Sequence, residues 1–110
     1  MSFEHKNLAG GRWKELSFVD QMANIGSEVE RALKWRTKQN TAYAQKAFER
    51  ALELMDLSLE NIKGFSRLKE LTRLREAIVD YFFGENQFKS TEASWQKYFS
   101  YFTYAARRNH

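Results

Sequence analysis

Few residues of this 110-residue chain are of the types that commonly carry out nucleophilic, acid–base or metal chemistry. Cysteine is absent, so disulfides, thiolate catalysis and cysteine-ligated zinc are excluded. The two histidines, His5 and His110, lie at the two ends of the chain, where the backbone usually frays. These positions argue against histidine-based proton transfer or metal ligation, and we expect neither a metal site nor a cofactor.

A row of carboxylates is the first pattern with a possible chemistry. Glu49, Glu53, Asp56 and Glu60 are spaced so that they share one line of a helix. Oxygen ligands suit magnesium or calcium. However, metal-binding carboxylates in helical bundles project inward and usually include a Glu-x-x-His pair, which this chain lacks. We therefore interpret the row as a solvated acidic face.

Arg75 is the most unusual basic residue because its helical position lies within an apolar stripe. That stripe consists of Leu68, Leu71, Ile78, Val79 and Phe82. A buried guanidinium needs a carboxylate, carbonyl groups, water or a ligand. No carboxylate is predicted at the centre of an inward face, so we expect Arg75 to lie in a cleft and bind a ligand or partner chain. The alternative is that a small rotation of the helix brings Arg75 to solvent or to Glu30.

Basic and aromatic residues alternate near the end of the chain. The basic–aromatic row consists of Lys97, Tyr101, Tyr104 and Arg108, which share one helical face without an acidic residue between them. Cations for phosphates and rings for bases suit single-stranded nucleic acid. Tyrosine and arginine are also enriched in protein interfaces. Because a net charge of +4 makes a weak field, we favour a protein interface over RNA.

Further candidate binding residues lie earlier in the chain, namely Arg31, Trp35 and Arg36. Glu28 is spaced to pair with Arg31 along a helix, so part of this positive charge is expected to be neutralised locally. Arg36 shares the inward face of Phe18, but it lies near the predicted end of the helix, where its guanidinium can reach water.

Four helical segments are expected to position these residues. Proline is absent and apolar residues recur with helical periodicity over about 17–38, 41–62, 66–83 and 91–108, after an irregular lead over about 1–16. Ser17 and Asn40 are predicted N-caps, and Gly64 is predicted to end the second helix. Helices of similar length with short connections predict one all-α domain, 1–110, folded as an up-down antiparallel four-helix bundle.

The second predicted helix is apolar over more than half of its circumference. Leu54, Leu57 and Tyr43 widen its inward stripe to one side. Such a helix needs a second surface to bury against. That surface is either the lead, which offers three apolar anchors including Trp13, or a second protomer. We favour the second protomer and therefore expect a homodimer.

The sequence predicts neither a membrane span nor a signal peptide. No stretch approaches the roughly 20 apolar residues that a membrane span needs. The first residues lack the apolar core of a signal peptide. We expect a cytoplasmic protein with no membrane association.

The segment 75–82, Arg-Glu-Ala-Ile-Val-Asp-Tyr-Phe, resembles the signature of HEPN-type helical bundles. That signature is an arginine, a polar residue and a histidine about a turn later, often followed by tyrosine. HEPN domains commonly dimerise; many are metal-independent ribonucleases of toxin–antitoxin and defence systems, or partners of small nucleotidyltransferases. The resemblance matches Arg75, Glu76 and Tyr81 to the motif, with Asp80 where the histidine belongs.

The aspartate at this position bears directly on the predicted function. Imidazole is the group poised for proton transfer near neutral pH, and the motif lacks it here. We predict a non-enzymatic, self-associating helical bundle that binds a protein partner, such as a nucleotidyltransferase-like protein, or RNA. A second hypothesis is an active ribonuclease or RNA-modifying enzyme that uses Arg75 and Tyr81. A third hypothesis is a purely structural interaction module.

Overall fold

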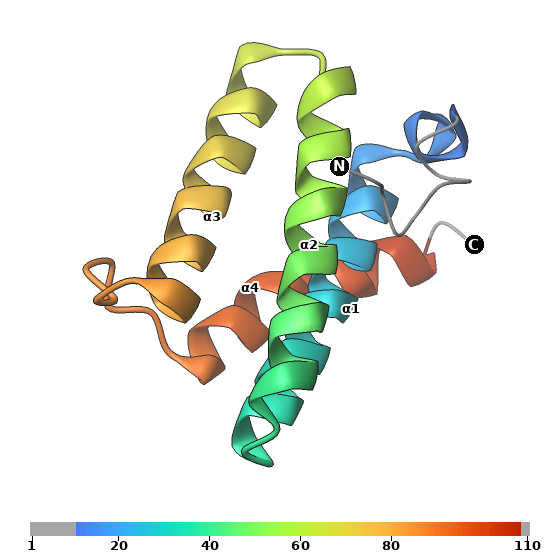
Figure 1. Ribbon diagram of the computed structural model, residues 1–110. Coiled ribbons are helices and arrows are strands. Elements are labelled where there is room, and N and C mark those ends of the chain that lie inside the picture. Colours follow the sequence, from blue (N-terminus) through green and yellow to red (C-terminus); the bar gives the residue numbers. More distant parts are fainter. Residues whose placement is uncertain (1–10, 109–110) are drawn as a thin grey trace.

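The computed structural model describes residues 11–108, and this part of the chain is an all-α four-helix bundle (Figure 1). A short 3-10 helix, η2 (Trp13–Glu15), precedes the bundle. The helices are α1 (Phe18–Thr37), α2 (Thr41–Asn61), α3 (Phe65–Phe83) and α4 (Glu92–Arg108). The predicted fold class is confirmed. No helix in this range is long and apolar enough to cross a lipid bilayer.

Side-chain caps begin three of the helices close to the predicted positions. Ser17 Oγ accepts a hydrogen bond from the Asp20 N–H at 3.1 Å, and Asn40 Oδ1 accepts one from the Tyr43 N–H at 3.1 Å. Thr91 caps α4, since its Oγ1 accepts a hydrogen bond from the Ser94 N–H at 3.0 Å. These bonds satisfy amide groups that a helix start leaves unpaired.

The helix α3 begins differently from the prediction. It starts at Phe65 directly after Gly64, which precedes the helix without a side-chain cap. The φ of Gly64 is 98°, a left-handed value that glycine adopts without strain. Gly64 thus makes the sharp turn that sends α3 back along α2.

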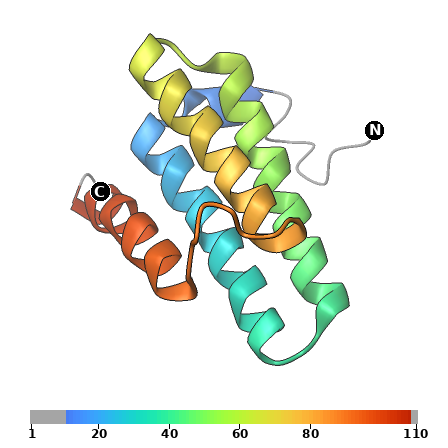
Figure 2. The same ribbon diagram turned by 90° about the vertical axis from the view of Figure 1, so that its left-hand side faces the viewer.

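The helices run in alternating directions, and α1 is central to their packing. In Figure 1, α1 and α3 run antiparallel to α2, which lies between them, and α4 crosses the bundle obliquely. Figure 2 shows α4 beside α1 and running in the opposite direction. The most extensive packing joins α1 to α2 and α1 to α4, whereas α3 packs mainly on α2. The helix α3 is therefore less closely packed against the rest of the bundle than α1 and α2 are against each other.

The core is formed by one apolar face of each of the four helices. Its main buried side chains are Met22, Ile25, Val29, Leu33, Ala47, Phe48, Ala51, Met55, Leu71, Ile78, Trp95, Phe99 and Phe102. A Cβ at Gly26 would lie 2.8 Å from the Phe99 Cβ, closer than side chains tolerate. Gly26 therefore lets α4 approach the backbone of α1.

The predicted inward face of α3 is confirmed only in part. Leu71 and Ile78 are buried, but Leu68 is exposed, and Leu74, which lies outside the predicted stripe, is buried. In the structure α3 packs mainly on one helix, which buries only a narrow stripe. This difference in orientation places Arg75 at the flank of α3 instead of its inward centre.

Trp13 of the lead covers part of the wide apolar face of α2. Trp13 is buried, and its Nε1 donates a hydrogen bond to Ser58 Oγ at 2.9 Å. Ser58 Oγ donates to Gln21 Oε1 at 2.8 Å, and Gln21 Nε2 donates to the Trp13 carbonyl at 3.0 Å, which closes the ring. Leu54 and Leu57 are buried within the chain, whereas Tyr43, the third residue that widens this face, is 49% exposed.

Candidate functional site

Arg75 pairs with a carboxylate of its own chain. Its Nε donates to Asp56 Oδ1 at 2.8 Å, and its Nη2 donates to Asp56 Oδ2 at 3.4 Å. The two side chains are 37% and 46% exposed, respectively, so the pair lies at the surface between α2 and α3. Our expectation that no carboxylate would meet Arg75 is wrong, because the rotation of α3 brings Arg75 to Asp56 on the acidic row.

The rest of the acidic row remains at the surface. Glu49 and Glu60 are exposed, and Glu49 Oε1 accepts a hydrogen bond from Gln45 Nε2 at 3.2 Å. Within residues 11–108, no group of three or more histidine or acidic side chains lies close enough together to hold a metal ion. His5 and His110 lie outside the described residues.

Asp80, at the position of the HEPN histidine, fixes the loop between α3 and α4. Its Oδ1 accepts the Gln87 N–H at 2.9 Å, and its Oδ2 accepts the Phe88 N–H at 3.0 Å. Its carbonyl oxygen accepts the N–H groups of Gly84 and Asn86. Asp80 therefore has a structural role in the loop.

Tyr81 lies in an aromatic cluster away from Arg75. Its ring packs edge-to-face on Trp95 of α4, with 6.0 Å between the ring centroids. The guanidinium of Arg36 lies 5.0 Å from the Tyr81 ring centroid and 5.5 Å from that of Phe82. Arg36 is exposed, as predicted for a guanidinium near the end of its helix. Since Arg75 instead pairs with α2, the two candidate catalytic residues make contacts with different helices.

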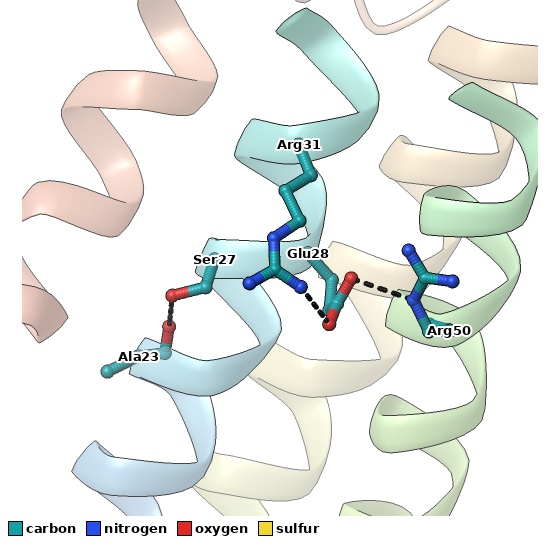
Figure 3. A network of polar contacts seen from close by, with 5 residues as sticks. All are labelled: Ala23, Ser27, Glu28, Arg31 and Arg50. Atoms are coloured by element: carbon teal, nitrogen blue, oxygen red, sulfur yellow. Dashed lines mark hydrogen bonds and ion pairs between the residues drawn. The ribbon is translucent and has the colours of Figure 1, made fainter. Parts of the chain in front are cut away.

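The predicted pairing of Arg31 with Glu28 is confirmed. Glu28 is buried, and its Oε1 accepts a hydrogen bond from Arg31 Nη1 at 3.2 Å. Its Oε2 also accepts one from Arg50 Nε at 3.1 Å (Figure 3). The sequence did not predict Arg50, which extends from α2. The carboxylate thus joins α1 to α2, and Arg31 is occupied by this contact.

Trp35 belongs to the packing of the α1–α2 hairpin. Its ring lies edge-to-face with that of Tyr43, at a centroid distance of 4.9 Å. The Lys38 Nζ lies 5.2 Å from the Trp35 ring centroid. Trp35 therefore takes part in local ring packing with Tyr43 and in a cation–π contact with Lys38.

The basic–aromatic row lies on the outer face of α4 and is open to contact. Tyr101 is 66% exposed and Tyr104 is 64% exposed, and Lys97 and Arg108 are also exposed. The Arg108 guanidinium lies 5.8 Å from the Tyr104 ring centroid. The structure thus brings the four predicted residues onto one accessible face, while Trp95, Phe99 and Phe102 of the same helix are buried.

A second surface, which sequence reasoning missed, lies beside this row. The α3–α4 groove is an open depression of about 990 Å³ between the two helices and the loop that joins them. Leu74, Ala77 and Trp95 are among the apolar residues that line it. Phe65, 77% exposed, and Phe88, 59% exposed, also line the groove. Leu74 and Ala77 are apolar residues of α3 that lie outside the predicted stripe, and they could have indicated this groove from the sequence.

Two polar side chains in the groove are distinctive. The Trp95 Nε1 is buried and has no hydrogen-bond partner among the described residues. Tyr98 OH donates to Glu70 Oε2 at 2.9 Å, which joins α4 to α3. Burial, followed by this hydrogen bond and the negative charge of Glu70, raises the pKa of Tyr98 well above its ordinary value. Tyr98 therefore acts as a neutral hydrogen-bond donor across the physiological range.

Searches against protein-family models, curated proteins and solved structures found no match to this chain. The functional argument consequently depends on the geometry of these surfaces.

Proposed function

We propose that this chain is a non-enzymatic helical module that binds another protein through the outer face of α4. The observation that carries the proposal is the exposure of Tyr101 and Tyr104 beside Lys97 and Arg108. Tyrosine and arginine are typical anchors of protein interfaces because they combine large contact area with hydrogen-bonding groups.

The contacts of the HEPN-like residues favour binding over catalysis. Arg75 pairs with Asp56, and Asp80 holds the amides of the α3–α4 loop. Tyr81 packs against Trp95 and Arg36. General acid–base catalysis needs its groups within reach of one substrate, whereas these residues make separate structural contacts. A HEPN-like bundle that keeps only partner binding, for example to a nucleotidyltransferase-like protein, fits this arrangement.

RNA is the competing ligand for the basic–aromatic row. Lys97 and Tyr101 line a depression that also includes the Glu70 side chain. A carboxylate at this position opposes the approach of phosphate groups, and the net charge of +4 gives little long-range attraction. These charges favour a protein as the partner.

Exposed rings beside the α3–α4 groove give the predicted self-association a second candidate surface. On α2, Leu54 and Leu57 are buried within the chain and Tyr43 is 49% exposed. The exposed rings of Phe65 and Phe88 border the α3–α4 groove and are available to a second copy. A dimer would therefore use the groove, whereas the proposed partner binds the basic–aromatic row.

The proposal can be tested with a variant that removes both rings of the row, Tyr101→Ser with Tyr104→Ser. The tagged wild-type chain should co-purify with one protein in a fixed stoichiometric ratio, and the variant should lose it while melting at a similar temperature. Tyr43→Ser, an exposed tyrosine on α2, is the matched control and should retain the partner. A variant that retains the complex would contradict the proposal, as would tight, salt-sensitive binding of oligouridine to the row.

A further inference from the structure

We propose that the basic–aromatic row of one copy of this chain binds the acidic row of a second copy, so that the copies associate head to tail. The acidic row consists of Glu49, Glu53, Asp56 and Glu60 on α2. This inference rests on the proposed function, because it names the partner of the same α4 face.

The two rows have the same spacing. Each row occupies positions i, i+4, i+7 and i+11 of its helix, so its two outer charges are about 17 Å apart at 1.5 Å per residue. The outer residues are Lys97 and Arg108 in one row and Glu49 and Glu60 in the other. The pattern reads the same in both directions. Both ends can therefore pair at once, whether the two helices lie parallel or antiparallel.

Both rows are accessible, and they lie on different sides of the molecule. The acidic row lies opposite the buried residues Ala47 and Ala51 of α2, and the basic–aromatic row lies opposite Trp95 and Phe99 of α4. Figure 2 shows α2 and α4 on opposite sides of the bundle with α1 between them, and α1 packs on both. The two rows therefore cannot pair within one copy.

The acidic row keeps an excess of negative charge after its neighbours are counted. Arg75 offsets the charge of Asp56. Lys46 is exposed one turn before Glu49 on the same helix. Against these two cations the row presents four carboxylates, so it remains attractive to a basic surface.

The basic–aromatic row keeps an excess of positive charge. Arg107 is exposed beside Arg108 and lies three positions after Tyr104, so it borders the same face. Glu70 of α3 shares a depression with Lys97. Among the described residues at this face, three cations thus stand against one bordering carboxylate. Opposite potentials on two surfaces steer their encounter and determine how they align.

The tyrosines add contacts that charges alone would not provide. The inner positions of the two rows are Tyr101 and Tyr104 on α4 and Glu53 and Asp56 on α2. A phenol hydroxyl can donate to a carboxylate, which has about four lone-pair sites. Asp56 can therefore accept such a bond while it keeps its ion pair with Arg75. The tyrosine rings also bury apolar area when a second helix covers them.

A contact between two different surfaces of the same chain is heterologous. Each copy in such a pair keeps one row free for another copy, so the association extends beyond two copies unless it closes into a ring. It therefore differs from a dimer through the α3–α4 groove. Exposed ion pairs are individually weak and are screened by salt. We expect the association to depend on protein concentration and on ionic strength.

The test compares charge-reversed variants of the 110-residue chain by sedimentation velocity at low ionic strength. The basic-row variant carries Lys97→Glu and Arg108→Glu, and the acidic-row variant carries Glu49→Lys and Glu60→Lys. All four residues are exposed, so both variants should melt close to the wild type. The average mass of the wild type should rise with concentration. Each variant alone should stay monomeric, because like charges then face each other.

Mixing the two variants is the decisive step. Each reversed row then meets a row of opposite charge on the other variant, so the equimolar mixture should recover the association of the wild type. One chain that carries all four substitutions should recover it as well. Raising the salt concentration from about 0.02 M to about 0.5 M should weaken the association at least about tenfold.

Control variants separate the rows from the net charge. Lys14→Glu with Lys34→Glu changes the net charge as the basic-row variant does, and Glu15→Lys with Glu85→Lys matches the acidic-row variant. These four residues are exposed and lie outside both rows. Both controls should associate as the wild type does.

Contrary results would overturn the inference in three ways. The wild type may stay monomeric up to about 1 mM, or the mixture of variants may stay monomeric. Association that survives reversal of either row would assign the contact between copies to another surface, such as the α3–α4 groove.

The Tyr101→Ser and Tyr104→Ser variant separates this inference from the proposed function. If copies associate through the rows, this variant should weaken their association about tenfold. If the wild type is monomeric and the tyrosine variant loses a different protein, the inference fails and the proposed function stands. If the tyrosine variant loses no protein and associates as the wild type does, both fail.

Discussion

Arg75 and Asp56 are each other's partners across the α2–α3 boundary, with 2.8 Å between Arg75 Nε and Asp56 Oδ1. The sequence pattern predicted that Arg75 is a buried cation that needs a ligand, and that Asp56 is a carboxylate that faces solvent. The pairing gives Arg75 its partner within the chain. It also removes the main reason to regard Arg75 as a binding or catalytic group.

Breaking this ion pair should have little effect on stability. Both partners are partly exposed, and such pairs contribute about 0 to 1 kcal/mol. We expect the coupling free energy from a double-mutant cycle of Arg75→Met and Asp56→Asn, measured by urea unfolding, to fall in this range. A loss of about 3 to 5 kcal/mol on replacing one partner, typical of a stranded buried charge, would contradict this account.

The ring of hydrogen bonds formed by Trp13, Gln21 and Ser58 should be more important for stability. Ser58→Ala removes the acceptor of the Trp13 indole and the donor to Gln21 in a buried site. We expect a loss of about 1 to 3 kcal/mol in the free energy of unfolding. Ser100→Ala, at an exposed serine of α4, is the control and should change it by less than about 0.5 kcal/mol. Similar effects of both substitutions would show that the lead is not held by this network.

Asp80 should determine the order of the loop between α3 and α4. Asp80→Ala removes the acceptors of the Gln87 and Phe88 amides, so these amides should exchange with deuterium faster than in the wild type. Amides near the middle of α1 should keep their exchange rates, because Asp80 does not contact them. Unchanged exchange at Gln87 and Phe88 would mean that the loop is held by other contacts.

Tyr98 should ionise at a higher pH than an ordinary tyrosine. Its pKa is raised by burial and by its hydrogen bond to Glu70, so its stabilising effect is present below about pH 10 and is lost as pH rises through the raised pKa. The tyrosinate absorbance of the wild type minus that of Tyr98→Phe should stay near zero up to about pH 11. A difference that appears at about pH 10, as for free tyrosine, would show that the phenol is not shielded.

The amino-acid sequence predicted the helices better than their contacts. Local signals marked the N-caps Ser17 and Asn40, and periodicity found the inward faces of α1, α2 and α4. Both signals act within one helix and depend only on neighbouring residues. They could not determine how α3 turns on its axis, which depends on its packing against α2.

The contacts that the sequence missed are long-range and polar. The partner of Arg75 is 19 positions away, and Arg50 is 22 positions from Glu28. Trp13 and Ser58 are 45 positions apart. The α3–α4 groove likewise depends on how two helices diverge in space. By contrast, the basic–aromatic row was predictable because its four residues belong to a single exposed helical face.

The most direct test of the proposed function is site-specific photo-crosslinking with benzoylphenylalanine in place of Tyr104, Phe88 or Tyr43. We predict that the probes at positions 104 and 88 crosslink the same protein, because the row and the groove border one another, and that the probe at 43, on α2, does not. The crosslink at 104 should also disappear when unlabelled wild-type chain is added in excess. Identical products from all three positions, or RNA as the main product at 104, would contradict the account.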